Sequence, residues 1–396
     1  MKKNILHLDL DTFFVSCERL IDSRLQKRPL LVGGTGDRGV VAACSYETRL
    51  FGVHSGMSMK VAKRLCPEAV IVRGNTTTYS KYSKIVTEII KEKVPLFEKA
   101  SIDEFYADLT GMDTFFGSYK YASELRHRII KESGLPISFG LSVNKIVSKV
   151  ATGEAKPNNQ LLINEGCEKE FMAPLSIRKI PSVGKRTYQT LRNLGVNKVK
   201  VIQEMPVEML VSVLGLNGRT IWKRAHGIDN SPLVPFHERK SISIERTFNK
   251  DTIDIRKLSE TIFAMAENLA YQLRKGEKIA SVICVKIRYS DFNTYTKQVK
   301  IPYTSADHII IPTVLELFKK LYQRRLLIRL VGVKITDIVS GNYQINLFDD
   351  SEQMLNLYNA MDTIRNKYGE LSVTRAASMN AKTIGRFSNP FNGEPP

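Results

Sequence analysis

Residues 5–11 read ILHLDLD, and residues 101–108 read SIDEFYAD. The first stretch is a short apolar run that ends in the acids Asp9 and Asp11, which is typical of a buried strand whose carboxyl end reaches a site. The second stretch puts Asp103 and Glu104 in the turn of a strand-turn-strand segment over 97–109. If the two strands are neighbours in one sheet, Asp9, Asp103 and Glu104 converge at one edge of it.

Three carboxylates so close together repel one another unless cations neutralise them. Hard oxygen ligands favour Mg²⁺ or Mn²⁺ over zinc, and two such ions suit in-line phosphoryl transfer. The spacing alone leaves polymerases, nucleases and nucleotide cyclases open.

The elements around these two strands indicate a mixed α/β domain. Helical periodicity over 79–93, 119–132 and 144–154 alternates with two strands in 28–45, one at 137–143 and one near Leu161. Short helices with glycine turns follow over 174–227. After a polar, proline-containing linker, residues 241–339 have the order β-α-β-β-α-β of a split βαβ unit.

Composition favours a nucleic-acid partner. The chain has 396 residues, a net charge of +19 and 43% hydrophobic residues, which excludes a wholly disordered basic protein. Residues 166–240 carry 13 basic and 6 acidic side chains, and residues 241–340 carry 17 and 10. Such a basic middle fits a polyanion, although a basic surface that serves only solubility is the alternative.

Other classes are disfavoured. Because no stretch approaches about 20 apolar residues, we expect no membrane association and a soluble, cytoplasmic protein. The 5 cysteines form no C-x-x-C pair, so we expect reduced thiols and no zinc site.

Four longer stretches occur in a characteristic order: HLDLDTFFVSCE, VVAACSYETRLFGVHSGM, SIDEFYADLTG and FGLSVNKIVSKVATGEAKPN. Together they resemble the Y-family translesion DNA polymerases, most closely the DinB or DNA polymerase IV branch, over residues 1 to about 345. The resemblance implies a multidomain α+β fold of the right-hand polymerase type. Its parts would be a ferredoxin-like catalytic palm (1–10 and 75–165), small fingers (11–74), a helical thumb with a helix-hairpin-helix (166–230), a linker (231–240), a DNA-binding little finger (241–340) and a tail (341–396).

The resemblance also implies a catalytic site. Asp9, Asp103 and Glu104, with the carbonyl of Leu10, would hold two Mg²⁺ ions, for which Mn²⁺ is a possible substitute, while Asp11 would be structural. The expected nucleotide-binding residues are Phe13, Phe14, Tyr46, Arg49 and Lys156.

Within this set, Phe14 matches the steric gate against a 2′-hydroxyl, and core packing is the better reading for Phe13. Tyr46, Arg49 and Lys156 match the triphosphate-binding residues. The small Ala42 and Gly56 match residues that line the nascent base pair, which implies an open pocket and low fidelity.

The DNA contacts carried over by the resemblance lie in the thumb and little finger. Gly184 and Lys185 belong to a helix-hairpin-helix, in which Ser182 stands where the family often has a second glycine. The basic little-finger candidates on or beside expected strands are Arg246, Arg288 and Arg329, with Lys297 and Arg325.

Residues 344–348, QINLF, resemble the peptide that binds the bacterial, beta-type sliding clamp, through Gln344, Leu347 and Phe348. A simple strand end is the alternative reading of this short pattern. About 48 residues follow Phe348, with an expected helix over 352–368, and an extension at this place is similar to that of UmuC-type relatives.

The resemblance therefore predicts an error-prone, translesion DNA-directed DNA polymerase, a nucleotidyltransferase that adds dNMP to a primer 3′ end in DNA repair and damage tolerance. There is no second acidic cluster for proofreading. We expect primer-template DNA, dNTP and a sliding clamp as partners of a monomer. The alternatives are a two-metal nuclease or nucleotide cyclase on a similar palm, or an inactive, clamp-bound DNA-binding accessory protein.

Overall fold

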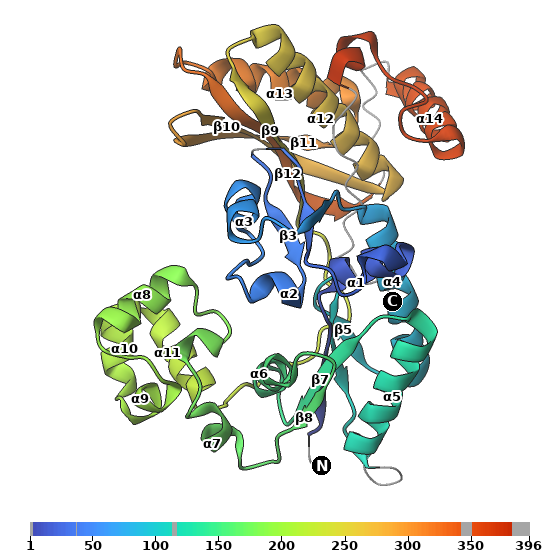
Figure 1. Ribbon diagram of the computed structural model, residues 1–396. Coiled ribbons are helices and arrows are strands. Elements are labelled where there is room, and N and C mark those ends of the chain that lie inside the picture. The colour runs from blue at the N-terminus through green and yellow to red at the C-terminus, as the bar shows by residue number, and fades with distance from the viewer. Residues whose placement is uncertain (1–2, 37, 113–116, 342–350, 382–396) are drawn as a thin grey trace. The chain divides into compact units, whose positions relative to one another are not determined.

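The computed structural model describes residues 3–36, 38–112, 117–341 and 351–381 (Figure 1). The chain divides into two compact units, and the boundary between them, at His237 and Glu238, falls within the expected linker. Each unit is described by itself. No helix in the described ranges is both long and apolar enough to cross a membrane.

A five-stranded sheet in the order β5-β6-β1-β7-β8 forms the centre of unit 1. Its strands are β1 (Ile5–Leu10), β5 (Phe97–Lys99), β6 (Glu104–Asp108), β7 (Ile137–Ser142) and β8 (Gln160–Leu162). The central strand β1 pairs antiparallel with both β6 and β7, so the expected neighbourhood of the two acidic strands is confirmed.

Helices cover both faces of this sheet (Figure 1). Helices α4 (Thr76–Lys93) and α5 (Ser118–Ser133) lie on one face, and α6 (Lys145–Ala155) lies on the other. Side chains alternate along β1, so Leu6, Leu8 and Leu10 join the core beneath α4 and α5. The odd-numbered residues of β1 face α6, which fixes the direction in which Asp9 points.

A second, three-stranded sheet, in the order β3-β2-β4, contains β2 (Leu30–Gly33), β3 (Val41–Cys44) and β4 (Val70–Val72). Helices α1 (Phe13–Ile21), α2 (Tyr46–Arg49) and α3 (Met59–Leu65) lie in the same part of the chain. The apolar core is continuous from the central sheet into α1 and β2, because Phe13, Val15 and Leu30 belong to one cluster with the β1 leucines.

The last part of unit 1 is helical. It consists of α7 (Glu168–Met172), α8 (Lys185–Asn193), α9 (Val199–Glu204), α10 (Val207–Leu214) and α11 (Leu216–Ala225), around a small core of their own. Gly218 allows α11 to cross α10 closely, since a Cβ there would collide with the carbonyl of Leu210. The expected short helices with glycine turns are therefore present.

Unit 2 has the expected β-α-β-β-α-β order. Its strands β9 (Ser241–Thr252), β10 (Lys278–Tyr289), β11 (Thr294–Thr304) and β12 (Ile328–Ser340) form an antiparallel sheet in the order β11-β10-β12-β9. Helices α12 (Ile255–Lys275) and α13 (Asp307–Leu321) cover one face, and their apolar sides form the core with alternate strand residues. We call the opposite face of this sheet the open face.

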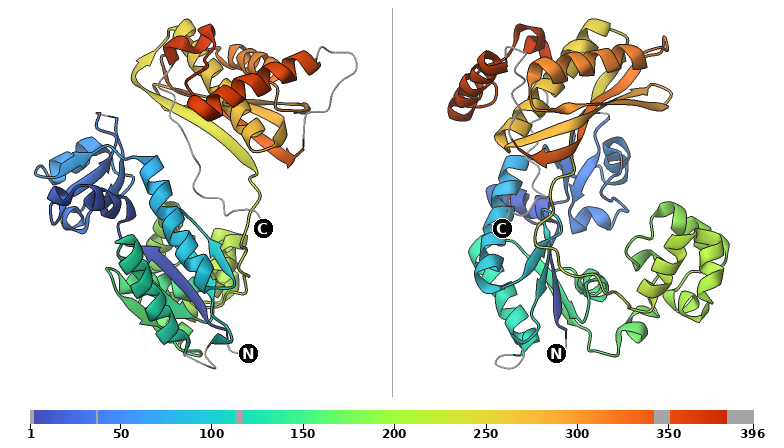
Figure 2. Two further views of the ribbon diagram at one scale, coloured as in Figure 1. Left: turned by 90° about the vertical axis from the view of Figure 1, so that its right-hand side faces the viewer. Right: turned by 180° about the vertical axis from the view of Figure 1, so that it is seen from behind.

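The C-terminal extension adds a third layer to unit 2. It consists of α14 (Ser351–Tyr368) and the 3₁₀ helix η4 (Ala376–Ala381), and Figure 2 shows α14 along the outer side of the helical layer. The helix expected over 352–368 is confirmed. The extension docks on α12 and α13.

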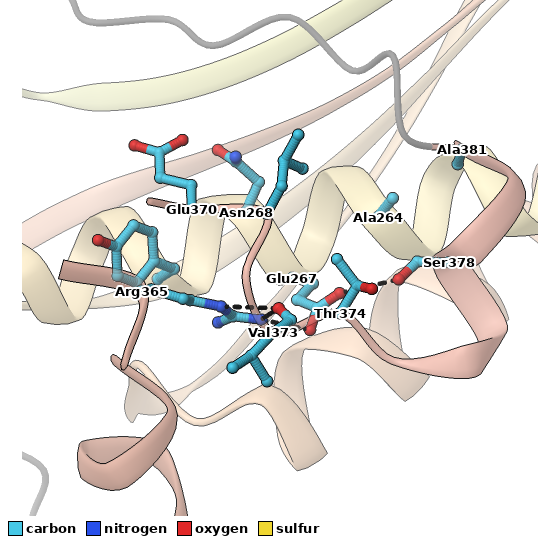
Figure 3. A pocket seen from close by; sticks show the side chains of 11 residues that line it. Ala264, Glu267, Asn268, Arg365, Glu370, Val373, Thr374, Ser378 and Ala381 are labelled. Atoms are coloured by element: carbon cyan, nitrogen blue, oxygen red, sulfur yellow. Dashed lines mark hydrogen bonds and ion pairs between the residues drawn. The ribbon is translucent and has the colours of Figure 1, made fainter. Parts of the chain in front are cut away.

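Buried ion pairs hold this extension in place (Figure 3). Arg365 of α14 reaches Glu267 of α12 at 2.8 Å, and both side chains are less than 10% exposed. Arg375 also contacts Glu267, and Ser378 donates a hydrogen bond to it at 3.1 Å. A second group joins Arg274 to Asp307 and Asp362, each at 2.6 Å. Six charged side chains thus bind the extension to the two helices. A small pocket lies between the extension and α12.

Candidate active site

The backbone brings the four expected metal-binding residues to one end of two adjacent strands. Asp9 of β1 is the register partner of Glu104 of β6. One residue further on, the Leu10 N–H donates to the Asp103 carbonyl at 3.0 Å. Ser101 closes the turn, because its hydroxyl accepts from the N–H groups of both Asp103 and Glu104.

Each of the three carboxylates has a partner of its own. Lys156 lies 2.5 Å from Asp9, and Lys149 lies 2.5 Å from Glu104. The Ser101 hydroxyl donates to Asp103 at 2.5 Å. Within the described ranges, no three Asp, Glu, His or Cys side chains surround a common point at metal-binding distance. The structure therefore brings the backbone positions together, while the side chains are turned towards two lysines and a serine.

The electrostatics of these acids fit a divalent cation. Burial raises the pKa of Asp9 from 3.8 to about 7, although Lys156 lowers it, and the charges of Glu104 and Asp103 raise it further. Burial, chiefly, also raises the pKa of Asp103. Buried oxygen donors that are costly to ionise by themselves fit a hard cation such as Mg²⁺ or Mn²⁺.

Asp11 differs from the other acids. It is buried, and its carboxylate accepts from the Ser138 hydroxyl at 2.9 and 3.1 Å and from the Asn158 N–H at 2.6 Å. These bonds join β1 to β7 and to the segment before β8, which fits the structural role expected for Asp11.

The two phenylalanines open α1 and point differently. Phe13 is 3% exposed and belongs to the core, whereas Phe14 is half-buried and only packs against that core. The Phe14 ring stacks on the ring of Tyr79 from α4, with centroids 4.3 Å apart and planes 14° apart. This arrangement agrees with the core reading of Phe13 and leaves Phe14 as the accessible ring.

The expected triphosphate-binding residues lie around Asp9 and Asp11. Tyr46 begins α2, and its hydroxyl lies 3.4 Å from an Asp11 oxygen. The Arg49 guanidinium stacks over the Tyr46 ring at 4.9 Å. Lys156 follows α6 directly and contacts both Asp9 and Asp11. A cluster of three donors thus borders the acidic strand end.

Sequence reasoning missed Lys149, although the signal was present. Lys149 lies on α6, and Lys156 is the residue that ends this helix, seven positions or about two turns further on. Both lysines contact acids at the same strand end. The helical period, applied to the residues after Asn144, could have placed both lysines over the acids of β1 and β6.

In the helical part of unit 1, the expected helix-hairpin-helix turn has a serine with left-handed backbone. Ser182 has φ of +73°, whereas Gly184 has an ordinary extended conformation and caps α8. The glycine common at position 182 in the family would adopt this conformation more easily. Arg224 supports the turn, because its guanidinium donates to the Pro181 carbonyl at 2.8 Å and to the Ser182 hydroxyl at 2.6 Å. Lys185 is the first residue of α8.

The structure divides the basic candidates of unit 2 between two faces of the sheet. Arg246 pairs in register with the core residue Val331, so it lies on the face that carries the helices. Lys297 lies on the same side, because it pairs with the core residue Val285. Arg329 stacks over the Phe292 ring at 4.5 Å, beside the β10–β11 turn.

Arg288, by contrast, lies on the open face, where it pairs with Thr294 and Leu330. Strand alternation puts three further lysines, which sequence reasoning missed, on this same face: Lys286, Lys300 and Lys334. The expected clamp-binding residues Gln344, Leu347 and Phe348 lie outside the described residues.

Comparison with known proteins now identifies the class. Residues 8–153 match the impB/mucB/samB family, residues 239–347 match its C-terminal domain, and residues 165–196 match the helix-hairpin-helix motif of the same family. DNA polymerase IV of Dehalococcoides mccartyi strain CBDB1 is 38% identical over 386 residues, covering 96% of this chain and 99% of that protein. DNA polymerase IV of Desulfatibacillum aliphaticivorans is 33% identical and covers 94% of this chain and 96% of that protein.

A solved structure supports the fold. A Y-family DNA polymerase chimera of Dbh and Dpo4 superposes with a TM-score of 0.77 at 24% identity, covering 85% of this chain and 100% of that one. The chain belongs to the impB/mucB/samB family, the Y-family DNA polymerases, and shares the multidomain α+β fold of that family. Within it, the chain is DinB-like and is a translesion, DNA-directed DNA polymerase.

The alignment with the Dehalococcoides protein also reaches the C-terminal extension. Because it covers 96% of this chain, it includes most of residues 349–396. A protein named DNA polymerase IV is therefore similar to this chain over most of the extension.

Proposed function

We propose that this polymerase transfers dNMP to a primer 3′ end with two Mg²⁺ ions, for which Mn²⁺ can substitute, held by Asp9, the Leu10 carbonyl, Asp103 and Glu104. The observation that carries the proposal is the backbone geometry, in which the Asp9–Glu104 register pair and the Leu10–Asp103 hydrogen bond bring the four residues to one end of two adjacent strands. When bound, the ions would polarise the primer hydroxyl and the reacting phosphate.

Lys149 of α6 and Lys156, which follows this helix, have a role in the metal-free state. Lys149 and Lys156 neutralise Glu104 and Asp9, and so reduce the repulsion among acids that are buried close together. The carboxylates must turn from these lysines to bind cations. Lys156 would then be available for phosphate oxygens, together with Tyr46 and Arg49.

A guanidinium suits that task, because its planar donors can engage two phosphate oxygens at once. Arg49 is held by stacking on Tyr46, so its position is already restricted before the nucleotide binds. This preorganisation supports a triphosphate substrate, which a nuclease does not need.

Phe14 would select the sugar. Its half-buried ring follows the acidic strand by a few residues and would lie beneath the sugar, where it leaves no room for a 2′-hydroxyl. Ala42 and Gly56 are exposed, which fits an open pocket that checks the shape of the base pair weakly. Low fidelity on intact DNA follows, and no separate proofreading site is proposed.

The duplex would be held through its phosphates. We assign this contact to Gly184 and Lys185 in the thumb and to the open face of the unit 2 sheet, where Arg288 lies among lysines. We assign no base reading to these groups, so binding should depend strongly on salt and little on sequence. Gln344, Leu347 and Phe348 would recruit a beta-type sliding clamp to a protein that is monomeric by itself.

The experiment is primer extension with one dNTP and Mg²⁺, on intact and damaged templates. Wild-type protein should extend the primer, and the variant Asp103→Ala/Glu104→Ala should retain primer-template binding but lose extension by at least about a thousandfold. Strand shortening, or turnover of the nucleotide without DNA, would contradict the proposal. Undiminished extension by the double variant would refute the assignment of the metal ligands.

A further inference from the structure

A buried carboxylate is linked to the ring of Phe14 through Tyr79. Glu18 lies four residues after Phe14 on α1, hence on the same side of the helix, and is 8% exposed. The Tyr79 hydroxyl, from α4, donates to Glu18 at 2.5 Å. The same Tyr79 side chain, 1% exposed, stacks its ring on Phe14.

These contacts link the side chains of Phe14, Glu18 and Tyr79 into one cluster. The tyrosine ring supports Phe14 by nearly parallel stacking, and the ring of Phe13 meets Tyr79 edge-on at a centroid distance of 6.3 Å. The hydroxyl end of Tyr79 is fixed by Glu18. Glu18 and Phe14 belong to one helix, so the cluster is joined at both ends. It therefore restricts both the height and the tilt of the Phe14 ring.

The hydrogen bond between Tyr79 and Glu18 is of a strong kind. A hydroxyl bound to a carboxylate at this distance is charge-assisted and roughly twice as strong as a neutral hydrogen bond. Burial and the neighbouring Glu18 raise the pKa of Tyr79, so its hydroxyl stays protonated and able to donate. An apolar side chain at position 18 would fill the space without needing a partner, so the carboxylate is a costly choice for simple core packing.

We infer that Glu18 and Tyr79 are positioning residues for sugar selection, which hold the Phe14 ring at the height that excludes a 2′-hydroxyl. This inference rests on the proposed role of Phe14 as the steric gate. A steric gate works only as far as its ring cannot move aside. A modest displacement of a side chain from its rotamer costs little, so an unsupported ring would move aside for a ribose.

Two variants remove the hydrogen bond in different ways. Tyr79→Phe keeps the stacked ring and removes only the hydroxyl, while Glu18→Met keeps the volume and removes the acceptor. Glu18→Gln retains an acceptor oxygen and should restore function. The matched control is Tyr121→Phe, which removes another tyrosine hydroxyl of unit 1. This hydroxyl donates to the Lys93 carbonyl at 2.6 Å and does not contact Phe14.

The measurement is single-turnover incorporation of a dNTP and of the corresponding rNTP opposite the same template base. We expect discrimination against the rNTP to fall about fivefold to tenfold in Tyr79→Phe and Glu18→Met, with dNTP incorporation within about threefold of wild type. Glu18→Gln and Tyr121→Phe should keep wild-type discrimination. The melting temperature of each variant shows whether folding is intact, and Tyr79→Phe suffices if Glu18→Met does not fold.

Phe14→Ala separates the proposed role of Phe14 as the steric gate from the inference about Glu18 and Tyr79. If it relaxes sugar selection while Tyr79→Phe and Glu18→Met do not, the gate stands and the inference about Glu18 is overturned. If dNTP and rNTP incorporation fall by the same factor in Tyr79→Phe, the pair is only structural, which also overturns it. If Phe14→Ala leaves sugar selection unchanged, Phe14 is not the gate, and the inference fails with that role.

Discussion

Raising the pH from 6 to 8 should strengthen the binding of Mn²⁺ to the metal-free protein by about tenfold. The reason is the pKa of Asp9, which burial raises to about 7. Because the ion binds the ionised carboxylate, about a tenth of the Asp9 side chains are competent at pH 6 and about nine tenths at pH 8. The raised pKa of Asp103 acts in the same direction.

The sign of the effect on folding follows from the same shift. An acid whose pKa is higher in the folded state than in the unfolded state stabilises the fold at low pH. That contribution is lost as the pH rises from about 4 to about 7. The metal-free protein should therefore lose stability over this range, and bound cations should reduce the loss because they stabilise the ionised form.

The assay is isothermal titration calorimetry of the metal-free full chain with Mn²⁺, at several pH values and constant ionic strength. Asp22→Asn is the control, since Asp22 is paired with Arg24 at the surface and lies outside the acidic strand end. In Lys156→Met, the midpoint of the pH dependence should move to higher pH, because Lys156 lowers the pKa of Asp9. An affinity that stays constant between pH 6 and 8 in the wild-type protein would refute the reasoning.

Three further outcomes are expected. Arg365→Met should destabilise unit 2 by about 3–5 kcal/mol in calorimetric unfolding, because it leaves Glu267 buried with a weaker set of partners, whereas the exposed Arg256→Met should cost less than about 1 kcal/mol. Gly140→Ala should destabilise the fold by about 1–3 kcal/mol and lower the melting temperature, because a Cβ would collide with the backbone of α6. Gly153→Ala, where an added Cβ has no neighbouring atom, should not lower it. The affinity for primer-template DNA, measured by fluorescence anisotropy, should fall at least about a hundredfold between 50 and 200 mM salt and change little with sequence.

The course of the chain was largely predictable, because strands and helices follow from local patterns. The apolar run of β1 and the strand-turn-strand pattern over 97–109 both indicated strands, and β1 and β6 are indeed neighbours. The β-α-β-β-α-β order of unit 2 was predictable for the same reason. Helix α1 was missed, because its start carries the Phe13–Phe14 pair, which was interpreted through its chemistry and not through its periodicity.

The partners of the site residues were less predictable, because they come from distant parts of the chain. Glu104 meets Lys149 from 45 residues away, and Asp9 meets Lys156 from 147 residues away. The sequence pattern of a strand also indicates only which residues share a face of the sheet. It does not indicate which of the two faces the helices cover. That is why Arg246 and Arg288 were grouped together although the sheet separates them.

The ion pairs beneath the C-terminal extension limit how relatives of this chain can lose the extension in evolution. A stop codon before α14 would remove both arginine partners of Glu267 on α12, Arg365 and Arg375, and would leave Asp307 on α13 with Arg274 alone. Both acids would then lie on a surface that is no longer covered. Relatives whose genes end before this point should therefore carry other residues at those two positions, and the loss of the extension and the replacement of these acids should have occurred together in their lineages.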